Sequence, residues 1–142
     1  MNLETFSFDI DGDGIAHAVF DVPGRSMNTL TGKAIADIIA ITKEVATNDK
    51  ITGLVISSGK ASGFCAGADL GEMNQQAGGG KPESEMSEAE LKAMQFERGF
   101  SLNKTLRELD TCGKPNAVAL DGLALGGGLE VALAGHYRVA AN

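Results

Sequence analysis

The feature that most limits how this chain can fold is a run of three glycines, residues 126–128, between two apolar segments. The apolar run at 117–120 favours a buried strand, and the run at 131–134 favours a helix. Because consecutive glycines remove every Cβ at this strand-to-helix turn, a ligand can approach the backbone closely. The first N–H groups of a helix have no internal partner and carry partial positive charge. The turn is therefore suited to holding an anion.

Glu130 follows in the first turn of the predicted helix. A carboxylate beside a site that stabilises negative charge is what proton transfer next to an oxyanion needs. A purely structural interpretation is also open, because a first-turn Glu often only complements the helix dipole and glycine runs often only turn the chain. A single local motif does not decide between the two.

The composition is that of one globular domain, with 142 residues of which 43% are hydrophobic and 22% are charged. The formal net charge of −7 argues against a nucleic-acid binder and leaves no basic stripe for a membrane surface. Two cysteines are too few for a disulfide framework, and no signal-like or membrane-spanning stretch opens the chain. We therefore expect a cytoplasmic protein without a membrane span or nucleic-acid partners.

The first half of the chain predicts a hairpin, a helix and a buried strand. Residues 5–10 alternate in polarity, and the turn at 11–14 leads to a second strand at 15–22. The turn resembles the start of a calcium loop, but Phe20 stands where the last ligand must be a Glu, so we expect no calcium. A helix capped by Thr31 and a strand at 51–57 follow, which together predict an α/β fold.

The second half predicts a long helix and two further strands. The polar stretch at about 75–87 is typical of a mobile surface loop. Ser87 with Glu90 predicts a capping box for a helix that runs to Asp110, and strands are expected at 116–120 and 137–140.

Residues 57–70 form a second turn rich in small residues, again after a buried strand and before a helical start near Ala68. Asp69 is interpreted here as a residue that favours the helix start. Cys65 has no basic partner nearby in the sequence and is expected to be a small buried residue. If the fold brings this turn to the glycine run, one N–H from each could hold a single oxyanion.

Other sites are not indicated. The Gly59-Lys60 pair lacks the glycine spacing and the hydroxyl residue of a P-loop, so a nucleoside triphosphate is not expected. His17 and His136 show no metal-ligand spacing, so we assign them structural roles and expect no metal.

Residues 64–70, read together with residues 121–130, resemble the paired signature of the crotonase superfamily of enoyl-CoA hydratases and isomerases. The resemblance extends from about Phe6 to the last residue. The sequence of residues 126–134 and 137–140 is most similar to the hydratase part of the multifunctional fatty-acid β-oxidation α subunits. In those proteins a dehydrogenase domain follows further along the chain. The resemblance implies an α/β crotonase-like (ClpP/crotonase) spiral of β-β-α units, assembled as trimers or larger complexes.

In that family two backbone N–H groups hold the thioester oxygen of an acyl-CoA, and by resemblance they fall on Ala68 and Gly127. Glu130 takes the position of the first catalytic glutamate, and Ala66 the position that contacts the CoA adenine. Arg25 and Lys60 are candidates to meet the CoA phosphates. Coenzyme A enters as part of the substrate, and no other cofactor is implied. The expected partners are an acyl-CoA thioester and further copies of the chain or a β-oxidation complex.

One departure from the family pattern concerns a second glutamate, which hydratases carry on a loop beyond the first. Only twelve residues follow Glu130 here, and none is acidic. We therefore expect residues 1–142 to be the N-terminal part of an enoyl-CoA hydratase/isomerase domain, with little or no hydratase activity alone. A Δ3-Δ2 enoyl-CoA isomerase, which needs one base, is an alternative. A non-catalytic fragment that binds CoA or associates with itself is another.

Overall fold

The computed structural model describes residues 1–72 and 83–141, with the side chains of 83 and 95–100 left out. Its elements, in chain order, are β1 (Phe6–Ile10), β2 (Ile15–Phe20), α1 (Gly32–Thr47), β3 (Gly53–Ser58), β4 (Gly63–Cys65), a 3-10 helix η1 (Glu83–Glu85), α3 (Glu88–Asp110), β5 (Asn116–Leu120), β6 (Leu123–Ala124), α4 (Gly127–Leu133) and β7 (Tyr137–Ala140).

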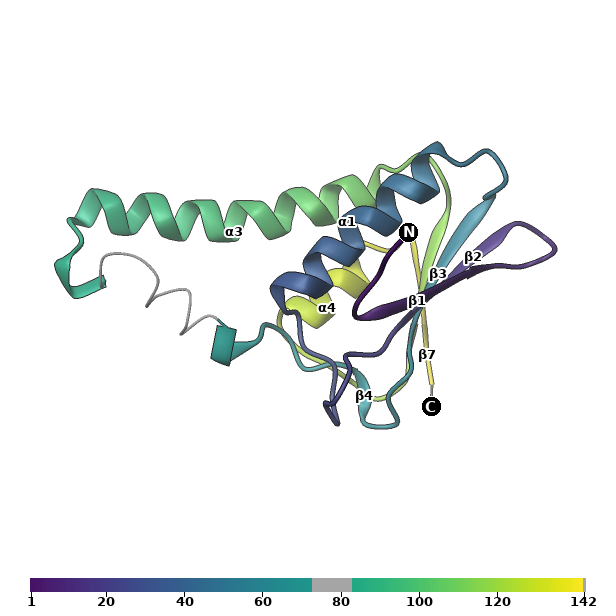
Figure 1. The fold of residues 1–142 in the computed structure, drawn as a ribbon, viewed down its shortest axis with the longest axis horizontal. Coiled ribbons are helices and arrows are strands. Elements are labelled where there is room, and N and C mark those ends of the chain that lie inside the picture. The colour runs from purple at the N-terminus through teal and green to yellow at the C-terminus, as the bar shows by residue number, and fades with distance from the viewer. Residues whose placement is uncertain (73–82, 142) are drawn as a thin grey trace.

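Five strands form one sheet in the order β1-β2-β3-β5-β7. β1 and β2 are the antiparallel hairpin that the sequence predicts, and the remaining neighbours are all parallel. Parallel neighbours need crossover connections, which here contain α1, α3 and α4. The helices gather on one side of the sheet (Figure 1). The predicted α/β class and the predicted strands are confirmed, with β2 ending at Phe20 rather than at residue 22.

The core lies between the sheet and α1. The rings of Phe6 on β1 and Phe20 on β2 stack with their centroids 4.5 Å apart. From α1, Ile38, Ile41 and Val45 are almost fully buried, as their helical spacing requires. The helix begins where the sequence predicts, because the Thr31 side chain accepts a hydrogen bond from the N–H of Ala34.

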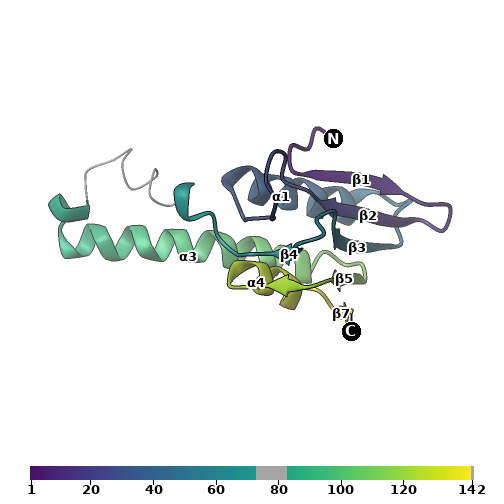
Figure 2. The same cartoon turned by 90° about the horizontal axis from the view of Figure 1, so that it is seen from below.

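α3 is long and only part of it packs on the body of the molecule. Its start carries the predicted capping box between Ser87 and Glu90. Its C-terminal part lies beside α1, and its N-terminal part extends away from the sheet in both views (Figures 1 and 2). Most of the predicted mobile loop at 75–87 lies outside the described residues, and its described end contains η1.

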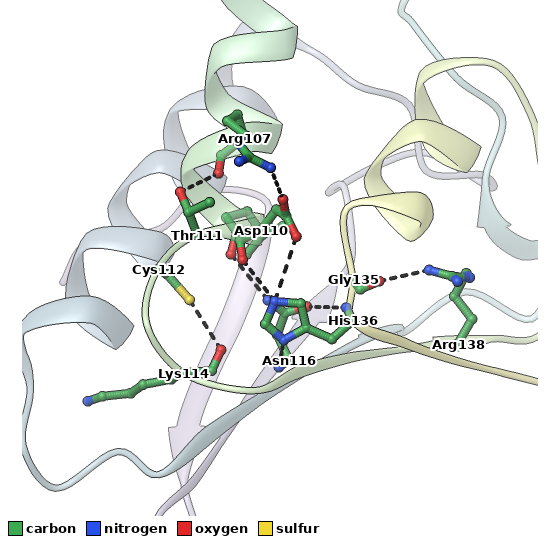
Figure 3. A network of polar contacts seen from close by, with 10 residues as sticks. Arg107, Asp110, Thr111, Cys112, Lys114, Asn116, Gly135, His136 and Arg138 are labelled. Atoms are coloured by element: carbon green, nitrogen blue, oxygen red, sulfur yellow. Dashed lines mark hydrogen bonds and ion pairs between the residues drawn. The ribbon is translucent and has the colours of Figure 1, made fainter.

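A polar network joins the end of α3 to the start of β5 and to the turn between α4 and β7 (Figure 3). His136 Nε2 lies 2.8 Å from the Asp110 carbonyl oxygen, and His136 Nδ1 accepts from the N–H of Asn116. The Asn116 side chain accepts from the His136 N–H and donates to the Leu109 carbonyl. His136 therefore has the structural role that the sequence suggests.

Two short strands form a separate parallel sheet, β4 with β6, which the sequence analysis did not predict. They lie within the two glycine-rich motifs, so this small sheet joins them. No helix in the described part of the chain is long and apolar enough to cross a membrane.

Candidate functional site

The small sheet brings the two glycine-rich turns side by side. Gly63 pairs with Leu123 and Cys65 with Ala124, and the Leu125 N–H donates to the Cys65 carbonyl at 3.0 Å. After each of these strands the chain enters a helical segment, which is residues 70–72 after β4 and α4 after β6. Residues separated by about half the chain therefore meet at one place.

The two turns approach so closely that side chains would not fit between them. A Cβ on Gly67 would lie 2.9 Å from the Leu125 carbonyl oxygen and 3.7 Å from the Gly127 nitrogen. A Cβ on Gly127 would lie 2.8 Å from Leu30 Cδ1 and 3.9 Å from the Ala68 nitrogen. The nitrogens of Ala68 and Gly127 are therefore near neighbours, which is the juxtaposition that the paired motifs lead us to expect.

Hydrogen bonds to Leu30 fix the orientation of the Ala68 N–H. The Leu30 N–H donates to the Gly67 carbonyl at 2.8 Å, and the Asp69 N–H donates to the Leu30 carbonyl at 3.1 Å. The Gly67 carbonyl and the Ala68 N–H belong to one planar trans peptide, so they point in opposite directions. Because the carbonyl points toward Leu30, the Ala68 N–H points away from it.

The Gly127 N–H is available because it opens α4. Gly126, the N-cap residue, has φ +47°, which a residue with a side chain rarely adopts. Two other N–H groups in the first turn of α4 have partners, since Gly128 donates to the Leu125 carbonyl and Glu130 to the Gly126 carbonyl. Within the described residues, neither the Ala68 nor the Gly127 N–H donates to a protein acceptor. Two N–H groups are thus left for an external oxygen.

Glu130 lies in the first turn of α4, three residues after Gly127, and is exposed. The two turns and the helical segments that follow them carry exposed leucines, with Leu70 at 72%, Leu125 at 51% and Leu129 at 42% exposure. Two N–H donors can stabilise a developing oxyanion, and a nearby carboxylate can accept or donate a proton. The arrangement can therefore support enolate or acyl-transfer chemistry on an apolar substrate.

Ala66 uses its N–H internally, donating to the Asn28 carbonyl at 2.9 Å. Asn28 itself is fully buried, and its side-chain amide donates to the carbonyls of Phe20 and Phe64 and to the hydroxyl of Ser58. It thereby holds β2, β3 and β4 together under the site. The sequence analysis assigned Asn28 no role, because its hydrogen-bond partners are remote in the chain.

The two candidate cations are each paired with a carboxylate. Arg25 donates to Asp69, and its side chain is 43% exposed. Lys60 pairs with Asp21 and also donates to the Val22 carbonyl at 2.9 Å, with a side chain only 15% exposed. Phosphate binding by these residues stays a prediction.

Asp69 and Cys65 lie on either side of Gly67. Two hydrogen bonds hold the pKa of the buried Asp69 carboxyl below its ordinary value. The bond from the Glu72 N–H has the larger effect and the bond from the Arg25 guanidinium the smaller. Cys65 is a free, buried thiol, as expected, and burial raises its pKa. A raised pKa leaves little thiolate, which fits a packing role.

Comparison with known proteins agrees with this arrangement of motifs. Residues 16–142 match the family described as enoyl-CoA hydratase/isomerase. The chain belongs to this family.

Among individual relatives, the fatty acid oxidation complex subunit alpha of Shewanella amazonensis is 38% identical over 139 residues, and that of Shewanella oneidensis is 36% identical over 141. The match covers 98% of this chain and 18% of each relative. The chain therefore spans less than a fifth of the length of these relatives.

Solved structures show the same fold. The enoyl-CoA hydratase of Shewanella pealeana superposes with a TM-score of 0.79 at 24% identity, covering 97% of this chain and 47% of that one. The enoyl-CoA hydratase of Mycobacterium smegmatis gives 0.81 at 22% identity, with 99% and 48% covered. The predicted crotonase-like fold is confirmed, and the chain spans about half the length of these structures.

Proposed function

We propose that this chain supplies the oxyanion hole and the first catalytic carboxylate of an enoyl-CoA hydratase of fatty-acid β-oxidation, which adds water to trans-2-enoyl-CoA. The observation that carries the proposal is the close approach of the Ala68 and Gly127 nitrogens at the junction of the two motifs. The fatty-acid oxidation names of the relatives support the substrate class.

In the proposed reaction Glu130 accepts a proton from a water molecule as the water oxygen bonds to C3 of the enoyl group. The π electrons move to C2 and onto the thioester oxygen, giving an enolate. The Ala68 and Gly127 N–H groups stabilise that oxygen. C2 then takes up a proton from a general acid, and this step completes the addition. Losing one such donor typically costs about 3 kcal/mol of transition-state stabilisation.

The CoA moiety would lie along the first turn. Because the Ala66 N–H is already donated to Asn28, the group that Ala66 can offer the adenine is its carbonyl. Arg25 and Lys60 would meet the phosphates while keeping their carboxylate partners. We further propose that the working enzyme is a homo-oligomer or a β-oxidation complex.

The second glutamate of hydratase chemistry has no counterpart among the twelve residues after Glu130. We propose that residues 1–142 form the N-terminal part of a hydratase domain and have little or no activity alone. A Δ3-Δ2 enoyl-CoA isomerase is a second candidate, because one carboxylate suffices to move a proton between C2 and C4. A non-catalytic CoA-binding role is a third.

The test measures hydration of 2-butenoyl-CoA through the loss of its enoyl absorbance. It compares this chain with a version extended through the rest of the domain. We expect turnover only in the extended protein, and Glu130→Gln there should lower kcat by about 10²- to 10⁴-fold. Glu108→Gln makes the same change at an exposed position on α3 and should have no effect. Full activity in Glu130→Gln would refute the role of Glu130.

The alternatives give different products. Conversion of 3-butenoyl-CoA to 2-butenoyl-CoA without hydration would favour the isomerase. Calorimetric binding of butanoyl-CoA to the extended protein, with no conversion of either enoyl-CoA by that protein, would favour the binding role. Hydration by the 142 residues themselves would refute the proposal that the chain is inactive alone.

A further inference from the structure

The Asp69 carboxylate is buried and connects two loops that are distant in the sequence. It is only 6% exposed. Its Oδ2 atom accepts from the Arg25 guanidinium and, at 3.2 Å, from the Thr29 hydroxyl. Arg25 also donates to Thr29 at 3.1 Å, so the three side chains form a closed triangle. The other oxygen, Oδ1, accepts from the Glu72 N–H at 2.8 Å and caps the helical start.

This triangle lies next to the bridge that orients the Ala68 N–H. Thr29 immediately precedes Leu30, and Asp69 immediately follows Ala68. The two bridge hydrogen bonds, from Leu30 to Gly67 and from Asp69 to Leu30, therefore join the same two loops as the triangle. One more hydrogen bond joins the segments that follow these loops, because the Glu72 side chain accepts from the Gly32 N–H at 2.7 Å.

We call the hydrogen bonds that join these two loops the clamp. The backbone conformation of Gly67 shows why the clamp is needed. Gly67 has φ +99°, and its backbone can take many other conformations. A peptide flip between Gly67 and Ala68 would turn the Ala68 N–H away from Gly127. In the described part of the chain, that flip is opposed directly by the bond from the Leu30 N–H to the Gly67 carbonyl at 2.8 Å and, more weakly, by the Cys65 thiol, which donates to the same carbonyl at 3.9 Å. The stronger of these bonds depends on the register of the two loops.

We propose that Asp69, through Arg25 and Thr29, is a positioning residue that fixes the Gly67–Ala68 peptide and so aims the Ala68 N–H at the oxyanion. Arg25 then has a structural role, which is to hold the Asp69 carboxylate, in addition to any contact with phosphate. The inference depends on the proposed function for the identity of the bound oxygen, whereas the clamp can be tested without a ligand.

The first test is amide hydrogen exchange of the free protein by NMR, with Asp69→Asn as the variant. The Asn side chain keeps an oxygen for the Glu72 N–H but loses the charge that Arg25 requires. We expect the backbone amides of Leu30 and of the substituted position 69 to exchange about tenfold faster, the size expected for a lost charged hydrogen bond. Unchanged protection of these two amides would overturn the proposal.

Asp37→Asn is the matched control. Asp37 is also 6% exposed and accepts from the Thr5 N–H and hydroxyl, away from the two turns. It should leave the Leu30 amide unchanged. Thr29→Val is a milder second variant in case Asp69→Asn does not fold, and it should accelerate the same amides by a smaller factor. An equal effect in Asp37→Asn would show general loosening and overturn the proposal.

The second test reports on the oxyanion site, using cinnamoyl-CoA as the probe. Its absorption moves to longer wavelength when N–H donors polarise the thioester carbonyl. We expect Asp69→Asn to lose at least half of the wild-type shift while still binding the probe, and Asp37→Asn to retain it. A full shift in Asp69→Asn would overturn the positioning role. Absence of a shift in the wild-type chain would instead count against the proposed function, and the exchange test would still judge the clamp.

Discussion

A single buried hydroxyl on α1 shows how one atom can weaken this fold. The Thr42 side chain is 6% exposed, and its Oγ1 has no hydrogen-bond partner in the described part of the chain. A buried polar atom without a hydrogen-bond partner lowers the free energy of unfolding. Val has nearly the same shape as Thr, with a methyl group in place of the hydroxyl. Thr42→Val should therefore raise the free energy of unfolding by about 1 kcal/mol.

Urea denaturation with an unchanged m-value is the measurement. Thr47→Val on the same helix is the control, because the Thr47 hydroxyl donates to the Lys43 carbonyl at 2.8 Å and is exposed. It should not stabilise. A Thr42→Val variant that is less stable than the wild type would show that the hydroxyl has a partner, such as a buried water.

At the same scale, the sequence indicated which two turns meet better than it indicated the residues that support them. The approach of the turns that carry Ala68 and Gly127 could be predicted because short motifs with special backbone requirements form them, and the roles of these residues and of Glu130 stay predictions. The contribution of Asp69 could not be predicted beyond a helix start, since its partner Arg25 is 44 residues away. The role of Asn28 was missed for the same reason. Long-range hydrogen bonds leave no periodic signal in a sequence.

The secondary-structure elements divide in a similar way. The long helices and the strands of the main sheet follow from hydrophobic period and caps, as Thr31 and the Ser87 capping box show. β4 and β6 have three and two residues, too few for an alternating pattern to appear. Their pairing depends on close packing of glycines, and this packing can be tested directly.

The contact between α4 and β4 leaves no room for a side chain on Gly128. An added Cβ would lie 2.7 Å from both the carbonyl oxygen and the Cβ of Cys65. Gly128→Ala should therefore destabilise the fold by about 1–3 kcal/mol, the usual cost of overpacking. Thermal unfolding should show the loss.

Gly12→Ala is the matched control, because a Cβ there meets no atom within 4 Å and its φ is not positive. That variant should be neutral within about 0.5 kcal/mol. Equal stability of the two variants would contradict the close packing of β4 against α4 described above.

Across the whole molecule, stability should fall from the centre of the sheet toward β7. β3 lies between β2 and β5, whereas β7 is an edge strand whose four residues are all exposed. Leu133 on α4, with Tyr137 and Val139 on β7, is more than half exposed, so little apolar burial holds this end. Local opening is easiest where burial is least.

Amide hydrogen exchange should therefore be at least about tenfold faster in β7 than in β3. The other edge, β1, should exchange more slowly than β7, because it pairs along a full hairpin and Phe6 is buried in the core. The experiment should be run at two protein concentrations. Protection of β7 that equals that of β3 and is independent of concentration would contradict the gradient. Protection that rises with concentration would mean that a second copy of the chain covers this edge, and the gradient would then belong to the monomer alone.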